Sequence, residues 1–344
     1  MRIPDWNQHV ISQQTCLLLG LGGLGSTVSI DLVRLGVKRI ICVDYDVVET
    51  HNLNRQSLYN QSHVGQPKAD CARQVLQQHH NICYRGDGGS NDVNGNGSAD
   101  RNENSKVDDT NEKNDKNDKN EVGNNNTKCS SSSSSNSRMQ TQIECYNMDA
   151  VKNWDRIVEF ARESTVVFNM IDVGDHWDYA VQALCLRFGL TFVSGGTFQT
   201  TVTVDYVHAQ SRGACWSCMS DLKSEHLSRM GVDQIEHLKN LEFIPMDEHP
   251  IGASTCYLAA ICAHLMVNRW IYGLQLSSSS CVHSSSLSSS ESDGADEDSE
   301  RTRQQHLLDS LPNRIMFYLN TLEVDKWTLE RSTDCPLCSS IHSS

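Results

Sequence analysis

The stretch Leu17–Gln56, LLLGLGGLGSTVSIDLVRLGVKRIICVDYDVVETHNLNRQ, decides the fold. A short apolar run, residues 15–19, comes directly before a glycine-rich turn of the form G-x-G-x-x-G. Residues 26–35 then carry apolar side chains at helical spacing and stop at Gly36, and glycine commonly follows the end of a helix. Residues 39–43 form a second apolar run. This order of strand, turn, helix and strand predicts the start of a doubly wound parallel sheet.

The rest of the chain continues this alternation of strands and helices. Residues 200–208 alternate apolar and polar side chains, as a half-buried antiparallel strand does. The fold class that we expect is therefore α/β, a Rossmann-like doubly wound sheet with an antiparallel extension. The further strands expected are residues 142–146, 165–171, 190–193, 315–319 and 326–329, and the further helices are residues 68–78, 153–162 and 179–188.

Two low-complexity segments interrupt the pattern. Residues 86–138 are rich in Asn, Asp, Gly, Lys and Ser, and residues 277–303 are a serine run followed by acids. Neither segment can bury enough apolar surface to offset the entropy cost of ordering it, so we expect both to be disordered insertions. About 260 residues remain, which suits a single core, so we expect one domain over residues 1–344.

Charge and composition exclude some classes of function. The formal net charge is -14, and no basic stripe indicates nucleic-acid binding. The apolar segment 257–274 contains His264, Asn268 and Arg269, which favours a buried helix over a membrane span. Residues 1–6 lack the apolar core of a signal peptide. We therefore expect a cytoplasmic or nuclear protein, in which the 14 cysteines stay reduced.

The turn and the residues after it indicate a nucleotide. Glycines let backbone N–H groups approach a phosphate at a helix N-terminus, and Asp44 is placed to accept from ribose hydroxyls. Arg55 and Lys68 follow. Two such cations can neutralise the β- and γ-phosphates of a triphosphate, whereas a dinucleotide has no γ-phosphate. The combination points to ATP. The glycines of the turn are Gly20, Gly22, Gly23 and Gly25.

Four motifs in this region resemble the ThiF/MoeB superfamily, which includes the activating enzymes of ubiquitin-like proteins. They are G-x-G-G-x-G-S from Gly20, D-x-D-x-V from Asp44, N-x-N-R-Q from Asn52 and P-K-A from Pro67. Residues 146–154 and the sequence around Cys215 look most like the ufmylation-type activating enzyme, whereas residues 16–20 resemble the autophagy activating enzyme. The resemblance implies one ThiF-type adenylation domain over residues 1–344, and the pathway stays open.

The resemblance also implies a reaction and its partners. The C-terminal glycine carboxylate of a ubiquitin-like modifier or a sulfur-carrier protein attacks the α-phosphate of ATP, pyrophosphate leaves and an acyl-adenylate remains. Such catalysis is mostly positioning and charge neutralisation. Relatives form homodimers or heterodimers, so we expect a dimer, and we expect no membrane or nucleic-acid partner. The residues placed on these groups are Gly23 by the phosphates, Asp44 on the ribose, Asn54, Arg55 and Lys68 on the polyphosphate, Asn147 near the adenine, and Asp172 on Mg2+ and the α-phosphate.

Two positions depart from the superfamily's pattern. The residue after the metal-binding aspartate is usually Asn, and in this chain it is Val173. That change removes one nucleotide contact and leaves the carboxylate of Asp172. Many members also receive an arginine from an N-terminal segment of the partner subunit, and Arg2 is the candidate before the first strand.

Two C-x-x-C pairs, Cys215 with Cys218 and Cys335 with Cys338, predict one four-cysteine zinc site. The pairs are much further apart in the chain than those of a zinc finger, and similar sites in many superfamily members support the pairing. Four thiolates leave no open coordination position, so the expected role is structural. Free thiols or a redox pair are the alternative.

Many relatives pass the acyl group on to a cysteine that precedes the apolar helix. Residues 219–254 contain no cysteine, and Cys256 is the nearest one. A cap at Ser254 or Thr255 would place Cys256 in the first helical turn, where backbone amides lower the pKa of a thiol. Cys256 is therefore a candidate nucleophile. The alternative is a small core residue like Cys262, and some superfamily members adenylate without forming a thioester.

Three other functions stay open. A scaffold subunit of an activating-enzyme heterodimer would suit the missing Asn and the displaced cysteine, but it would not need Arg55, Lys68 and Asp172 together. A nicotinamide-dependent oxidoreductase would have no use for the four-cysteine site. A tRNA-modifying adenylase of the same superfamily would need a basic surface. Asp247 and His249 are either contacts for the substrate's tail or solvated loop residues.

Overall fold

The structure, a computed structural model, describes residues 6–79, 140–198, 200–219, 254–278, 302–303, 305–333, 335 and 337–338. These residues belong to one unit of the chain, made of Met1–Ile82 and Met139–Ser344. The predicted insertion 86–138 lies outside the described residues, and so do Arg2, Asp247 and His249.

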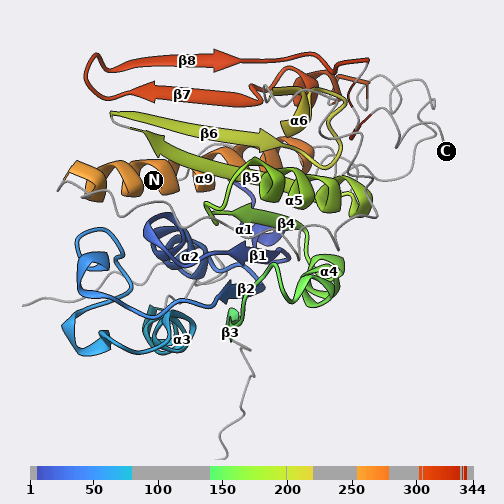
Figure 1. Cartoon of the computed structure of the whole chain (residues 1–344). Coiled ribbons are helices and arrows are strands. Elements are labelled where there is room, and N and C mark those ends of the chain that lie inside the picture. Colours follow the sequence, from blue (N-terminus) through green and yellow to red (C-terminus); the bar gives the residue numbers. More distant parts are fainter. Residues whose placement is uncertain are drawn as a thin grey trace, which may run out of the picture. The chain divides into compact units, whose positions relative to one another are not determined.

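One eight-stranded sheet runs through the described residues in the order β3-β2-β1-β4-β5-β6-β7-β8. The first five strands of this order pair in parallel, and β6, β7 and β8 add to β5 as antiparallel strands (Figure 1). The structure thus confirms the predicted α/β fold, a doubly wound sheet with an antiparallel extension. The strands are β1 Thr15–Leu19, β2 Arg39–Asp44, β3 Gln142–Asn147, β4 Val166–Asn169, β5 Thr191–Phe198, β6 Thr201–Val207, β7 Arg314–Tyr318 and β8 Glu323–Trp327.

Each face of the sheet has its own hydrophobic core. Successive side chains of a strand point to opposite faces, so in β1 Cys16 and Leu18 belong to one core and Leu17 and Leu19 to the other. All four side chains are fully buried. Because helices cover both faces, the parallel strands read as continuous apolar runs in the sequence.

The helices divide between the two cores. The first core takes apolar residues from α1 Gln8–Ile11, α2 Gly23–Leu35, α3 Lys68–His79 and α9 Ser254–Ser278. The second takes them from α4 Trp154–Arg162, α5 Asp175–Phe188 and α6 Trp216–Met219. Two short 3-10 helices, η1 Thr50–Asn52 and η2 Gln61–His63, lie between β2 and α3.

The long helix α9 packs against α2, β5 and β6. It comes so close to β5 that a Cβ added to Gly195 would lie 2.6 Å from Sδ of Met266, so the strand needs a glycine there. In the part of the chain that the structure describes, no helix is long and apolar enough to cross a membrane. The helix runs to Ser278, so it includes the first two residues of the predicted segment 277–303.

Some element boundaries differ from those expected. Helix α2 begins at Gly23, within the glycine-rich turn, three residues before the predicted start. Helix α5 begins at Asp175 because Gly174, with φ of +100°, supplies the turn that starts it. Strand β4 ends at Asn169, and β8 spans Glu323–Trp327 instead of 326–329.

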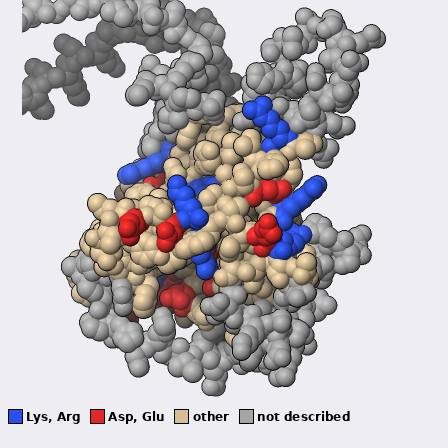
Figure 2. Space-filling view, turned by 90° about the horizontal axis from the view of Figure 1, so that it is seen from above, with Lys and Arg blue, Asp and Glu red and all other residues tan. Residues whose placement is uncertain are grey.

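Strand β8 forms the outer edge of the sheet's antiparallel end and carries the charged residues Glu323, Asp325 and Lys326. Charges on an edge strand oppose pairing with a further strand. Figure 2 looks down on this side of the molecule. There the described basic and acidic side chains lie close to one another instead of gathering by sign.

Candidate functional site

The glycine-rich turn leaves the end of β1 and enters α2. The N–H of Gly20 donates to the carbonyl of Val43 over 2.9 Å, which continues the β1–β2 ladder into the turn. Gly20 has φ of +95°, and a Cβ there would lie 3.0 Å from the carbonyl oxygen of Met170. A Cβ on Gly25 would lie 2.0 Å from the carbonyl oxygen of Gly20. The turn therefore needs glycine at both positions.

The Leu21 peptide is fixed on both sides. Its N–H donates to Oδ2 of Asp44 over 2.7 Å, and its carbonyl accepts from the hydroxyl of Tyr59 over 3.1 Å. The other oxygen of Asp44, Oδ1, accepts from the N–H of Asp46 over 2.8 Å. Burial raises the pKa of Asp44, and the charge of Lys68 and the two N–H donors act in the opposite direction. Asp44 thus positions the turn as well as facing the predicted ribose site.

The predicted polyphosphate residues Asn54 and Arg55 follow η1. The Arg55 guanidinium donates to the carbonyl of His51 over 3.0 Å and to Oδ1 of Asn54 over 3.2 Å. The Arg55 stem lies beside the first turn of α2, because a Cβ added to Gly23 would be 3.6 Å from Cγ of Arg55. Partial burial lowers the pKa of Arg55. The guanidinium is therefore held close to the glycine-rich turn.

Lys68 is the first residue of α3, and its side chain is 6% exposed. Its ammonium lies 2.7 Å from Oδ2 of Asp46, whose side chain is 48% exposed. The structure thus brings the second predicted cation to the residues that directly follow β2. It also gives that cation a carboxylate partner that the sequence did not indicate.

Asn147 and Asp172 lie at the same edge of the sheet. Asn147 pairs in register with Asp44 at the ends of β3 and β2. Asp172 is exposed and follows the end of β4, two residues after Met170, whose carbonyl lies against Gly20. The carboxyl ends of parallel strands are where open α/β sheets bind ligands. An exposed carboxylate at that edge has the oxygen donors that Mg2+ prefers.

The departure at Val173 has a structural consequence. The Val173 side chain packs against the second core, among partly buried apolar residues. An asparagine amide could not make that apolar contact. The chain has therefore exchanged a polar group at the nucleotide edge for packing.

One buried residue of this region had no role in the sequence-based prediction. Gln56 is 3% exposed, and its Oε1 is buried with no hydrogen-bond partner among the described residues. Its amide faces the turn, since a Cβ on Gly22 would be 3.9 Å from Nε2 of Gln56. Unpaired buried acceptors are rare in native proteins, so this oxygen fits a site that receives a donor from a ligand. Gln56 is the last residue of the motif N-x-N-R-Q, but the motif alone does not show that the side chain faces the turn.

The candidate nucleophile Cys256 is the third residue of α9, so its backbone is in the first turn of that helix, as expected. Its side chain lies outside the described part of the structure. Cys262, two turns further on, is a core residue. Its thiol is fully buried between α9 and the β5–β6 pair, and burial raises its pKa to about 12.

The four cysteines of the predicted zinc site come together at the second core. Their sulfur atoms all lie within 4.8 Å of one another. The Sγ–Sγ distances are 3.7 Å from Cys215 to Cys218, 3.5 Å from Cys215 to Cys335 and 3.6 Å from Cys218 to Cys338. A tetrahedral site with Zn–S bonds of about 2.3 Å has sulfurs about 3.8 Å apart, so the donor set fits zinc.

The electrostatics of this cysteine cluster also fit a metal. Hydrogen bonding to Cys215 lowers the pKa of Cys218 to about 6, and a similar bond lowers the pKa of Cys335. Hydrogen bonds within the cluster raise the pKa of Cys215 and of Cys338, so two of the four thiols favour the thiolate form that binds metals and two the protonated form. Cys215 and Cys218 flank the start of α6, and the other two follow β8, so the cluster joins two distant parts of the chain.

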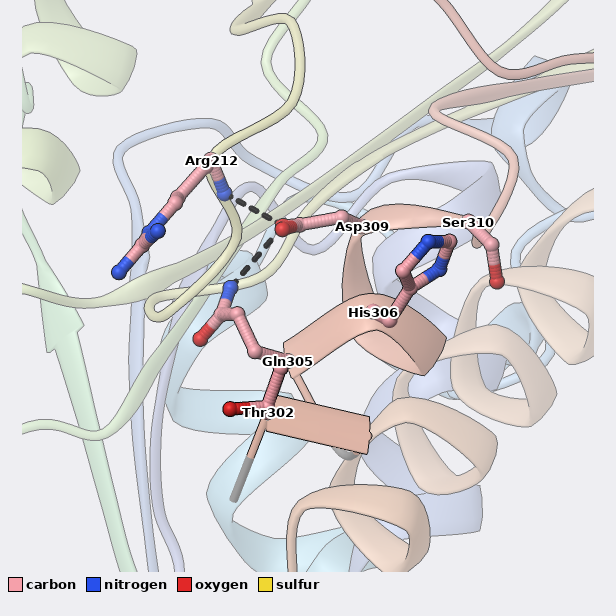
Figure 3. Close-up of a pocket in the computed structure, with 6 residues that line it drawn as sticks. All are labelled: Arg212, Thr302, Gln305, His306, Asp309 and Ser310. Atoms are coloured by element: carbon pink, nitrogen blue, oxygen red, sulfur yellow. Dashed lines mark hydrogen bonds between the residues drawn. The ribbon is translucent and has the colours of Figure 1, made fainter. Parts of the chain in front are cut away.

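A separate cavity of about 520 Å³ lies away from these residues (Figure 3). At its centre Oδ1 of Asp309 accepts from the N–H of Arg212 over 2.7 Å and from Nε2 of Gln305 over 3.0 Å. Figure 3 shows the side chains of Arg212 and His306 pointing apart. The cavity contains none of the predicted site residues. Its lining is Arg212, Thr302, Gln305, His306, Asp309 and Ser310.

Known proteins resemble the part of the chain that holds the turn. Residues 1–83 match the ThiF family. Molybdopterin-synthase adenylyltransferase of Escherichia coli K12 is 41% identical over 69 residues, which are 20% of this chain and 28% of that protein. Adenylyltransferase and sulfurtransferase MOCS3-1 of Zea mays is 38% identical over 93 residues, 23% and 20% of the two chains. Ubiquitin-like modifier-activating enzyme ATG7 of Saccharomyces cerevisiae is 42% identical over 76 residues, 22% and 12%.

These matches span less than a third of the length of each curated relative. The fold likeness extends further. The crystal structure of Escherichia coli MccB with ATP covers 96% of this chain and 68% of its own, with a TM-score of 0.53 and 15% sequence identity. Residues 1–83 thus match the ThiF family in sequence, and the relatives that share this part include adenylyltransferases and a ubiquitin-like modifier-activating enzyme.

Proposed function

We propose that this protein uses ATP to adenylate the C-terminal carboxylate of a ubiquitin-like modifier or a sulfur-carrier protein. The observation that carries the proposal is the arrangement at the carboxyl edge of the sheet. The glycine-rich turn, Asp44, Lys68 and Asp172 lie at or just beyond the ends of β1, β2 and β4, with Arg55 beside the first turn of α2. Names of relatives that contain adenylyltransferase or modifier-activating enzyme support the same class of reaction.

The reaction transfers an adenylyl group to a carboxylate. A carboxylate oxygen of the substrate protein attacks the α-phosphorus of ATP, the bond from that phosphorus to the bridging α–β oxygen breaks, and pyrophosphate leaves with that oxygen. Negative charge builds up on the leaving group. Fixed positive groups around the polyphosphate stabilise this charge, and they need no reorganisation if they are held in place beforehand.

The described residues supply these groups. Arg55 and Lys68 neutralise the polyphosphate, the N–H groups at the start of α2 approach its oxygens, and Asp44 accepts from the ribose. Gln56 offers a buried acceptor beside the turn. Asn147 pairs in register with Asp44. From that position it would contact the adenine.

Two metal ions belong to the proposal. Asp172 would hold Mg2+, which would shield the phosphate charges when bound. The four cysteines would hold Zn2+, which would join the end of β6 to the segment after β8 and have no part in the chemistry. A dimer, formed with a second copy or with a related subunit, completes the proposed assembly.

A thioester step at Cys256 is a further part of the proposal. The position of this residue in the first turn of α9 supports it, because amides at a helix N-terminus stabilise a thiolate. The thiolate would attack the acyl-adenylate carbonyl, the acyl–phosphate bond would break and AMP would leave. An enzyme without this step would end at the acyl-adenylate.

The test is ATP–pyrophosphate exchange by the purified protein with a panel of ubiquitin-like and sulfur-carrier proteins that end in glycine. We expect exchange with one member of the panel, and a loss of at least 100-fold in Asp172→Asn, about 2.7 kcal/mol of transition-state stabilisation. Lys326→Ala on the outer strand β8 is the matched control and keeps the wild-type rate. ATP binding without exchange in any mixture would favour a scaffold subunit instead.

The same mixtures on a non-reducing gel test the thioester. A thiol-sensitive adduct that disappears in Cys256→Ser, while pyrophosphate exchange continues, supports Cys256 as the nucleophile. If the adduct persists in that variant, Cys256 is not the acceptor. If no adduct forms although exchange occurs, the reaction ends at the acyl-adenylate.

A further inference from the structure

The ion pair between Lys68 and Asp46 is unequal in exposure. The lysine side chain is 6% exposed, whereas the aspartate side chain is 48% exposed. Among the described residues, Oδ2 of Asp46 is the one hydrogen-bond acceptor of this ammonium, at 2.7 Å. A buried ammonium needs a partner, because its desolvation is costly when it is left alone. Asp46 supplies that partner at the border between protein and solvent.

The backbone fixes both residues of this pair. The N–H of Lys68 donates to the carbonyl of Asp46 over 2.9 Å, and Val47 and Pro67 form a β-bridge. The two segments are also joined by a hydrogen bond of 2.8 Å from the N–H of Val48 to the carbonyl of Gln66. These main-chain bonds hold the backbones of the two residues side by side, which places the carboxylate within reach of the ammonium.

The second carboxylate near Lys68, that of Asp44, already holds two backbone N–H groups. Both oxygens of Asp44 already accept backbone bonds, Oδ2 from Leu21 and Oδ1 from Asp46. A shift of Asp44 toward the lysine would release the Leu21 peptide of the glycine-rich turn. Asp46 makes no bond of this kind with its carboxylate among the described residues, so it is the group that can hold Lys68.

We propose that Asp46 is a positioning residue for ATP, holding the Lys68 ammonium in the direction of the polyphosphate. An ammonium has three N–H donors, and one bond to Asp46 leaves two for phosphate oxygens. Lysine is flexible, so a fixed partner reduces the number of rotamers lost when the nucleotide binds. This inference rests on the proposed function, since it names a residue that serves the same site.

A purely structural ion pair would behave differently from a positioning residue. It would change the stability of the protein and leave the affinity for ATP as it was. A carboxylate that merely competed with phosphate for Lys68 would, on removal, tighten ATP binding. Positioning predicts weaker binding on removal, with most of the affinity restored by a neutral side chain that still accepts a hydrogen bond.

The test measures equilibrium binding of radiolabelled ATP by the full-length protein, with no acceptor protein present. We expect Asp46→Ala to weaken ATP binding about tenfold, and Asp46→Asn to lie within about threefold of the wild type. Lys68→Ala is expected to weaken binding at least as much. In the double variant Asp46→Ala with Lys68→Ala, the loss from Asp46→Ala should disappear, because Asp46 acts through Lys68.

In pyrophosphate exchange, Asp46→Ala should raise KM for ATP about tenfold with kcat within about twofold. Thermal unfolding of each variant checks that the protein is folded, and Asp46→Asn provides a folded variant if the alanine variant is unstable. Unchanged or tighter ATP binding in folded Asp46→Ala, or additive losses in the double variant, would overturn the inference and leave the proposed function intact. If the wild-type protein binds no ATP, the proposed function and this inference fail together.

Discussion

The backbone N–H of Leu21 donates a 2.7 Å hydrogen bond to Oδ2 of Asp44, so the carboxylate at the end of β2 fixes the turn at the end of β1. Asp44 is 8% exposed, and its second oxygen is bound to the N–H of Asp46. Hydrogen bonds to Asp44 thus join the ends of β1 and β2. A single carboxylate connects the glycine-rich turn to the segment that holds Lys68.

We expect Asp44→Asn to lose both stability and ATP binding. An amide can place only one oxygen, so one of the two backbone donors faces an NH2 group and stays unpaired. An unpaired buried donor costs about 1–3 kcal/mol. Urea unfolding measures the stability and labelled ATP the affinity. Asp325→Asn, an exchange of the same type at an exposed position of β8, is the control, and equal effects of the two changes would contradict the special position of Asp44.

Replacing a cysteine of the cluster should remove bound zinc and destabilise the second core. We expect about one zinc per chain in the wild type and almost none in Cys335→Ser, with a stability loss of roughly 4 kcal/mol or more, because a structural metal contributes directly to folding. Elemental analysis and urea unfolding measure the two effects. Cys71→Ala is the control: Cys71 lies on α3 in the first core, and this variant should bind as much zinc as the wild type. Wild-type protein that carries no zinc after expression with the metal would contradict the assignment.

Gly273 of α9 allows the helix to pack on β6. A Cβ there would lie 1.8 Å from the hydroxyl oxygen of Tyr206, so Gly273→Ala should lower the free energy of unfolding by about 1–3 kcal/mol. Gly196→Ala, where a Cβ meets nothing within 4 Å, is the control and should change it by less than about 1 kcal/mol. Adding Tyr206→Phe to Gly273→Ala should recover part of the loss. Thermal unfolding measures all three variants.

His208 should make the protein sensitive to acid. Burial, with the nearby charge of Arg269, lowers the pKa of His208 from the ordinary value of 6.5 to about 4. The unfolded chain therefore binds a proton at this site between about pH 6.5 and 4, while the folded protein does not. The stability that His208 contributes is present above about pH 6.5 and is lost as the pH falls toward 4.

At 1.36 kcal/mol per pKa unit, the full effect of His208 is at most about 3 kcal/mol. We expect His208→Gln to flatten the fall in stability between pH 7 and pH 5 in urea unfolding. His306→Gln, at an exposed position, is the control and should leave the slope unchanged. A slope that is the same in His208→Gln and in the wild type would show that His208 is not the titrating group.

The sequence predicted the elements that depend on local chemistry. β1 spans the predicted residues because it is an uninterrupted apolar run that ends at Gly20. The meeting of the four cysteines could be predicted because two C-x-x-C pairs are typical of one four-cysteine metal site. The last strand was predicted to begin at residue 326, three residues after the observed start of β8 at Glu323. It lies on the outer edge of the sheet, where exposed side chains such as Glu323 and Asp325 carry no apolar alternation.

Contacts between distant segments could not be predicted. The sequence predicts Arg55 and Lys68 as phosphate ligands from their residue types and order. The Asp46 partner of Lys68, in contrast, depends on the β-bridge between Val47 and Pro67. The buried amide of Gln56 is similar, since nothing in its neighbours along the chain shows that it faces Gly22. Such contacts are set by the packing of separate elements, and no local pattern encodes them.

The glycine-rich turn has consequences for the order in which the protein is synthesised. The turn is synthesised before the two segments that pack against it. Gly20 lies against the backbone of Met170, and a Cβ on Gly23 would be 3.4 Å from Cβ of Ala259. During translation the motif therefore appears before Met170 and Ala259, the residues that pack against it. A nascent chain that stops before residue 170 carries the recognisable glycine motif without the segments of Met170 and Ala259 that pack against it.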